Sequence, residues 1–185
     1  MRRRDLLPGL LLAPWWLASG WPLAAAAQSA ELLTLALRRD DGALTLEFAT
    51  RLALSRAVED ALQRGVPVYF VAEATLYRRR WYWRDDRVAR VRRTWRLAFQ
   101  PLTATWRVGL GALTQTYDTL NEALATLSAA GRWRIADLAD LDPDSRHYID
   151  FSYRLDTTQL PSPLQLSLAG QSDWVLRVER ELVLP

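Results

Sequence analysis

Residues 77–96 constrain the fold more than any other stretch of the chain. They contain nine arginines and five aromatic residues in twenty positions, divided by Asp85 and Asp86. Residues that alternate between apolar and charged character place their side chains on opposite faces of a β-strand. We therefore expect a long β-hairpin, with strands over residues 66–84 and 87–100 and a turn at the two aspartates.

A turn at Asp85 and Asp86 sets the register, because residue i then lies opposite residue 171 − i. The resulting opposed pairs are Trp81 with Arg90, Arg79 with Arg92, Arg78 with Arg93, and Leu76 with Trp95. Like charges directly opposite each other are unfavourable in a sheet. The arginines would then need acidic neighbours, water or a bound anion to offset their repulsion.

Two interpretations of this hairpin stay open. In one, it is a well-solvated hairpin whose arginine stems cover the tryptophans, with counter-charges from Glu47, Glu73 and residues 140–144. In the other, it is a binding surface, since arginine and aromatic residues are enriched at protein interfaces. The candidate surface comprises Arg79, Trp81, Trp83, Arg90 and Arg92, with Trp95 as a further aromatic that we expect to be buried instead.

The rest of the chain alternates strand and helix signals. Asp41–Gly42 predicts a hairpin turn between strands at 31–38 and 43–52. Ser55 is placed to begin a short helix that ends at Gly65, and the capping box of Thr119 and Glu122 begins a second helix that ends at Gly131. Further strands are expected at 103–110, 132–138, 148–155 and 173–184, with a turn at 160–163. The fold class is α+β: one domain with a mostly antiparallel sheet, curved or sandwich-like, and two helices.

The first 27 residues have the features of an export signal. Three arginines precede an apolar run that ends in a series of alanines, so we expect a signal peptide over 1–27 and a single domain over 28–185. Arg3 and Arg4, followed by Asp5 and two leucines, also fit the twin-arginine pattern, so the general secretory route and the twin-arginine route both stay open. We expect a periplasmic protein, with an uncleaved N-terminal membrane anchor as the alternative.

The composition excludes several classes of chemistry. The chain has no cysteine, and so no disulfide-linked partner and no thiolate site. Without residues 1–27 it has 21 basic and 20 acidic residues, and we do not expect it to bind nucleic acid. His147, the one histidine, has no nucleophile motif near it. Asp140, Asp142 and Asp144 begin like a calcium loop, but lack its later glycine and glutamate. We therefore expect no enzymatic activity, no metal and no cofactor.

Five segments together resemble a known family. They are LSRAVEDALQRGVPVYFVAE (54–73), RRRWYWRDD (78–86), RTWRLAF (93–99), YDTLNEALATLS (117–128) and LDTTQLPSPLQL (155–166). The chain resembles the bacterial envelope proteins of the domain-of-unknown-function family numbered 4390, which has no assigned activity. The resemblance also implies genes encoded near membrane-bound sensor kinases of the nitrogen-regulation type, and so an accessory role in sensing.

The expected function is binding. The preferred partner is the outward-facing part of a membrane protein, such as a sensor kinase, contacted through residues 77–96. The alternative is an anionic envelope component, either lipid or polysaccharide, because clustered arginines and interfacial tryptophans suit an anionic surface.

Overall fold

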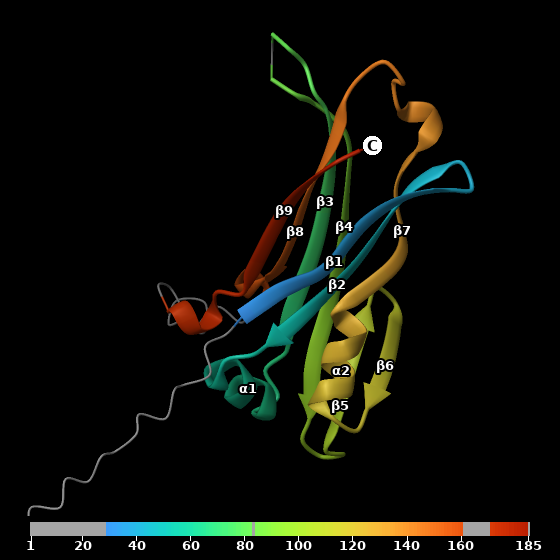
Figure 1. The fold of residues 1–185 in the computed structure, drawn as a ribbon. Coiled ribbons are helices and arrows are strands. Elements are labelled where there is room, and N and C mark those ends of the chain that lie inside the picture. The colour runs from blue at the N-terminus through green and yellow to red at the C-terminus, as the bar shows by residue number, and fades with distance from the viewer. Residues whose placement is uncertain (1–28, 83, 161–170, 185) are drawn as a thin grey trace, which may run out of the picture.

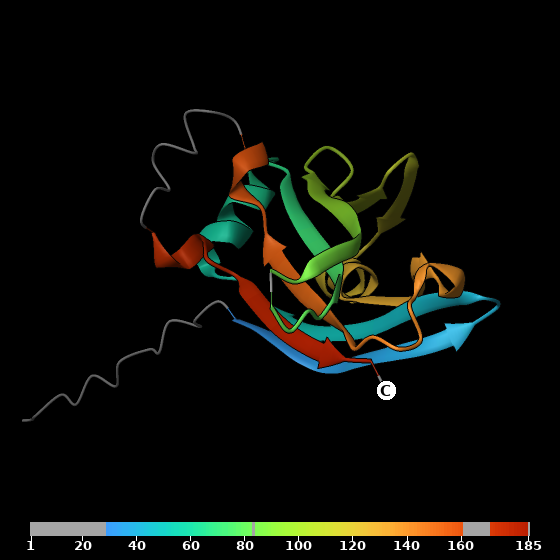
Figure 2. The same ribbon diagram turned by 90° about the horizontal axis from the view of Figure 1, so that it is seen from above.

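Two antiparallel sheets face each other in the computed structural model, which describes residues 29–82, 84–160 and 171–184 (Figure 1). The three-stranded sheet has the order β1-β2-β7, and the six-stranded sheet has the order β6-β5-β4-β3-β8-β9. The strands are β1 (Ser29–Asp40), β2 (Ala43–Ala53), β3 (Val68–Arg78), β4 (Asp86–Gln100), β5 (Thr105–Leu110), β6 (Leu113–Tyr117), β7 (Ala129–Asp137), β8 (His147–Leu155) and β9 (Arg177–Val183). Seen from above, the larger sheet curves over the smaller one (Figure 2). The expected α+β class is confirmed.

The first hairpin forms as the Asp-Gly signal predicts. Asp41 and Gly42 have φ angles of 48° and 73° between β1 and β2. Tight hairpin turns require positive φ at both central residues, and aspartate and glycine are among those that tolerate it best. Leu44, Leu46 and Phe48 of β2 are buried, so the alternation of this strand places its apolar face in the core.

Both helices begin at the predicted caps. In α1 (Arg56–Gln63) the Ser55 hydroxyl accepts a hydrogen bond from the Val58 amide at 3.2 Å. In α2 (Leu120–Leu127) Thr119 and Glu122 form the reciprocal capping box. The end predicted for α2 is wrong, because Gly131 lies inside β7. The chain leaves the helix at Ser128, whose carbonyl accepts from the Thr50 amide of β2 and so begins the sheet.

Aromatic rings fill the space between the sheets. Phe48 contacts four other rings at centroid distances of 5.0–6.2 Å, those of Trp95, Trp133, Phe151 and Tyr153. Together these rings join β2 and β7 of the small sheet to β4 and β8 of the large one. Trp95 is therefore part of the core, as expected.

The β3–β4 hairpin forms with a different register from the predicted one. Phe70 lies opposite Trp95 and Leu76 opposite Ala89, so residue i pairs with 165 − i over most of its length. The predicted pairs of Trp81 with Arg90, Arg79 with Arg92, Arg78 with Arg93, and Leu76 with Trp95 are all wrong. The observed register sets the apolar residues of β3 against those of β4. The predicted one would have placed Phe70 opposite Pro101, which has no amide hydrogen for the ladder.

Between Val68 and Leu76 the register moves by six residues, an even number, so the side chains of this part of the hairpin keep their predicted faces; a register shift follows between Leu76 and Tyr77. The strands are shorter than expected, and a loop that includes residues 79–82, 84 and 85 takes the place of a two-residue turn. We call this loop the hairpin tip. In Figure 1 it projects beyond the other elements at its end of the molecule.

The remaining differences are local. Strand β6 was not predicted, and β9 is shorter than the expected strand because a one-turn 3-10 helix, Ser172–Trp174, precedes it. Further 3-10 turns occur at Leu138–Asp140 and Thr157–Gln159. The expected export signal and most of the expected turn at 160–163 lie outside the described residues. Within the described ranges, no helix has the length and apolar character needed to cross a membrane.

Candidate functional site

Hydrogen bonds to two aspartates brace the hairpin tip. The Asp85 carboxylate accepts from the Arg80 amide at 3.0 Å and from the Tyr148 hydroxyl at 2.8 Å. The Asp86 carboxylate accepts from the guanidinium groups of Arg78 at 2.7 Å and Arg80 at 2.9 Å. These bonds lower the pKa of both carboxyl groups, chiefly through the Arg80 amide at Asp85 and through Arg78 at Asp86. These hydrogen bonds thus attach the tip to Tyr148 of β8 and to Arg78 at the end of β3.

Tyr148 is the main anchor of the tip. Its ring stacks on Tyr77 of β3 at a centroid distance of 5.3 Å, and the guanidinium carbon of Arg79 lies over the Tyr148 ring, 5.1 Å from its centroid. Burial, followed by the hydrogen bond to Asp85, raises the pKa of Tyr148 to about 12. Sequence reasoning placed Tyr148 at the start of a strand but gave it no role in the site.

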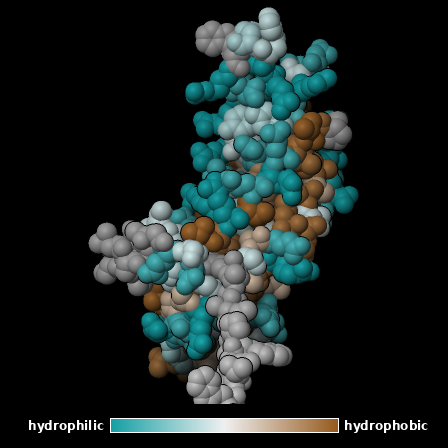
Figure 3. Space-filling view, turned by 60° about the vertical axis from the view of Figure 1, so that its left-hand side comes forward, coloured by the Kyte–Doolittle hydropathy of each residue, from teal (hydrophilic) through white to brown (hydrophobic). Residues whose placement is uncertain are grey.

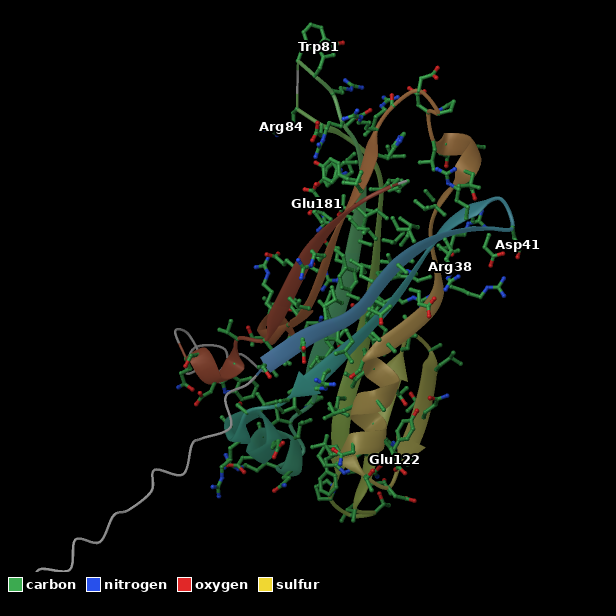
Figure 4. The ribbon with its side chains drawn as sticks, viewed as in Figure 1. Arg38, Asp41, Trp81, Arg84, Glu122 and Glu181 are labelled. Carbon is green, nitrogen blue, oxygen red and sulfur yellow. The ribbon has the colours of Figure 1, made fainter. Side chains whose placement is uncertain are left out.

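The aromatic side chains of Trp81 and Tyr82 stand exposed on this braced loop. Trp81 is 92% exposed and Tyr82 is 61% exposed, and their rings make an edge-to-face contact at 4.7 Å. Figure 4 shows Trp81 at the apex, pointing away from the body of the protein, with Arg84 on the returning side of the loop. An open groove lies between the tip and residues 144–146, lined on one side by Trp81 and on the other by Arg146.

The three predicted charge contacts are each bound to a carboxylate within the fold. Arg79 lies 3.4 Å from Glu181 of β9, Arg90 lies 2.8 Å from Glu73 of β3, and Arg92 lies 3.0 Å from Asp156 beyond β8. These contacts provide the acidic neighbours that opposed arginines were expected to need. The solvated-hairpin interpretation therefore describes Arg90 and Arg92 better than the binding interpretation does.

The predicted surface separates into two parts. Arg79 and Trp81 belong to the tip, whereas Arg90 and Arg92 lie along the outer face of the six-stranded sheet. Trp83, the fifth predicted residue, lies outside the described residues. In the space-filling view, the end of the molecule that carries the tip is mostly hydrophilic, while hydrophobic side chains gather along the flank below it (Figure 3). The exposed rings of the tip are therefore surrounded by polar groups.

The other sequence candidates do not assemble into a catalytic site. His147 is buried, with Nδ1 3.0 Å from the Ser145 carbonyl oxygen, and the Ser145 hydroxyl donates to Asp142 at 2.7 Å instead of to the imidazole. Asp142 also accepts from the Asp144 amide at 3.0 Å, so the acidic loop closes on itself. Among the described residues, no group of three histidine, aspartate or glutamate side chains is placed to hold a metal ion.

Comparison with known protein families identifies a match over most of the chain. Residues 27–183 match the family described as Domain of unknown function (DUF4390). No curated protein matches the chain, and no solved structure does.

Proposed function

The chain belongs to the DUF4390 family, whose function is unknown, and we propose that it is an exported binding protein without enzymatic activity. The partner is the outward-facing part of a membrane protein, of which a sensor kinase is one example. The hairpin tip makes the contact, with Trp81 as its central anchor and Tyr82 beside it.

The exposure of Trp81 on a braced loop carries this proposal. A tryptophan that is 92% exposed leaves a large apolar surface in water. The loop that presents it is held by Asp85 and Asp86, so docking requires little ordering of the backbone. Such preorganisation lowers the entropic cost of binding, and tryptophan, tyrosine and arginine are the residues that dominate binding energy at interfaces.

The charges at the tip favour a protein partner over an anionic membrane surface. Attraction to anionic lipid requires cations whose field is not already neutralised. Arg78 and Arg80 share the Asp86 carboxylate, and Arg79 is near Glu181 on β9, labelled in Figure 4. With these cations paired, the apolar area and shape of the tip supply most of the contact.

The test is photo-crosslinking in the native cell envelope. A photoreactive side chain at position 82 reports contacts of the tip, and a matched one at position 102 reports contacts of the β4–β5 turn, where Leu102 is 96% exposed at the other end of the molecule. We expect position 82 alone to crosslink to one integral membrane protein. Purified partner should bind the chain, with Trp81→Ala weakening binding at least tenfold and Leu102→Ala leaving it unchanged.

Two outcomes would overturn the proposal. Equal crosslinking from positions 82 and 102 would mean that the contacts are not specific to the tip. Alternatively, the chain could crosslink to no protein and cosediment with anionic vesicles in a manner that needs Trp81 and is abolished by salt. That result would replace the protein partner with the lipid alternative.

A further inference from the structure

A cleft at the opposite end of the molecule contains Arg93, which is bound to no carboxylate among the residues that the structure describes. The cleft opens between the inner faces of β4, β5 and β6 on one side and α2 with the start of β7 on the other, where Figure 1 shows α2 lying over β5 and β6. Its apolar lining includes Trp95, Val108, Leu110 and Ala130, and its polar lining includes Arg93 and Gln115. We call it the Arg93 cleft. It shares no residue with the hairpin tip.

Arg93 occupies a position that alternation assigns to the core face. It lies opposite Ala72 on the same face of β4 as the buried Trp95, and its guanidinium carbon is 5.2 Å from the centroid of the Trp133 ring. Among the residues that the structure describes, this cation–π contact with Trp133 is the one favourable electrostatic contact of Arg93. No carboxylate or other hydrogen-bond acceptor in the described part of the chain bonds to its guanidinium. Partial burial lowers the pKa of Arg93.

The isolation of Arg93 contrasts with its neighbours on β4. Arg90 and Arg92, which point to the outer face, are each bound to a carboxylate although water could solvate them freely. Arg93 carries five N–H donors in a partly desolvated position, where leaving donors unsatisfied is costly. An anionic acceptor is the component that this arrangement lacks, and guanidinium groups bind carboxylates through two parallel hydrogen bonds.

The size and lining of the cleft limit what can accompany that anion. Its volume is about 170 Å³, below the ~300 Å³ at which typical ligand pockets begin. A nucleotide or a large cofactor does not fit, whereas a short aliphatic chain does. Leu113, on the edge strand β6, lies at the lip with 73% of its surface exposed, and an aliphatic occupant would cover part of it.

We propose that the Arg93 cleft binds a small aliphatic carboxylate, with the carboxylate on the Arg93 guanidinium and the chain against Trp95, Val108 and Leu110. Because neither the cleft nor its ligand involves the tip, this proposal stands independently of the proposed docking function. The other polar side chains of the cleft, Gln115 and Thr126, are already hydrogen-bonded to Tyr117. The Tyr117 hydroxyl donates to the Gln115 side-chain oxygen at 2.5 Å and accepts from the Thr126 hydroxyl at 2.7 Å. Arg93 is thus the group that selects for charge.

The experiment titrates the full-length protein with hexanoate and follows its amide and indole N–H signals by NMR. We expect shifts confined to residues around the cleft, including the indole of Trp95, with saturable binding. Hexanamide, which has the same shape and no charge, should bind at least tenfold more weakly. Arg93→Gln should weaken hexanoate binding at least tenfold, whereas Arg96→Gln should leave it unchanged, because Arg96 lies on the exposed outer face of the same strand.

A variant at the lip guards against a folding defect. Leu113 is exposed, so Leu113→Ser should keep the fold and reduce hexanoate affinity severalfold through lost apolar contact. Any of three results would overturn the proposal. They are the absence of NMR shifts at the cleft at millimolar hexanoate, equal affinities for hexanoate and hexanamide, and equal effects of the Arg93 and Arg96 substitutions on hexanoate affinity.

Discussion

Asp156 tests whether Arg92 serves the fold or a partner. Asp156 directly follows β8 and is 5% exposed. Its two carboxylate oxygens together accept four hydrogen bonds. One oxygen accepts from the Thr158 amide at 3.2 Å and the Thr158 hydroxyl at 2.6 Å, and the other accepts from Gln159 at 2.9 Å and Arg92 at 3.0 Å. Asp156→Asn keeps the shape of the side chain but replaces one acceptor with a donor. Whichever way the amide turns, two donors lose their acceptor.

The expected loss of stability follows from these contacts. A hydrogen bond to a charged group contributes ~1.5–3 kcal/mol when it is well buried. The Arg92 side chain is 45% exposed, so water replaces part of what the substitution removes, and we expect a total loss of about 2 kcal/mol in the free energy of unfolding. Asp150→Asn is the matched control, because Asp150 is an exposed aspartate of the preceding strand β8 and should change stability by less than ~0.5 kcal/mol.

Urea unfolding across a pH series measures both predictions. Burial tends to raise the pKa of Asp156, but the hydrogen bonds from Thr158 and Gln159 outweigh it and hold the pKa below the ordinary value of 3.8. A carboxyl group with a lowered folded-state pKa stabilises the protein fully above its unfolded pKa, and this contribution is lost as the pH falls through the folded-state pKa. The difference between wild type and Asp156→Asn should therefore be full at neutral pH and shrink below about pH 4. A difference equal to that of Asp150→Asn, or one that stays constant into acid, would refute the reasoning.

Three further predictions concern the cap, the core and the tip. Thr119→Ala removes the capping box of α2 and should lower the unfolding free energy by about 1 kcal/mol in urea; an unchanged midpoint would contradict the assigned cap. Tyr153→Phe removes a buried hydroxyl that donates to the Leu127 carbonyl at 3.1 Å, and thermal and urea unfolding should both show a loss of about 1–2 kcal/mol. The difference between the ultraviolet titration curves of wild type and Tyr148→Phe should isolate the Tyr148 phenol. We expect it to ionise near pH 12, because burial and the hydrogen bond to Asp85 raise its pKa to about 12. Ionisation near the ordinary value of 10 would mean that the hydroxyl does not bond to Asp85.

Local signals predicted most elements of the fold. The Asp-Gly turn after β1 and the caps at Ser55 and Thr119 act within a few residues, so the sequence alone identifies them. Alternation likewise placed Trp95 in the core and predicted the faces of β3 and β4 correctly as far as the register shift after Leu76. The end of α2 depends on Ser128 bonding to Thr50, which is 78 residues away, and no local signal at Gly131 reports such a contact.

The site was less predictable because it depends on register and on tertiary partners. The prediction placed the turn at Asp85 and Asp86 because they are adjacent polar residues between two strand-like segments. In the fold they receive hydrogen bonds from Arg78, Arg80 and Tyr148. Tyr148 belongs to β8, and no signal in the sequence shows that β8 pairs with β3 of the hairpin. The signal that could have corrected the register is Pro101, which cannot donate to a ladder partner.

The correct register also decides which arginines are available for binding. With residue i opposite 165 − i, Glu73 lies directly across from Arg92 and diagonal to Arg90, and its carboxylate takes Arg90 while Asp156 takes Arg92. A shift of six residues would have left arginine against arginine and called for an external anion. Arg93, whose position on the inner face is beyond the reach of these carboxylates, is where we propose that an external anion binds. The observed register thus pairs Arg90 and Arg92 with carboxylates of the fold, which is why we propose binding through the exposed rings of the tip and through Arg93 instead.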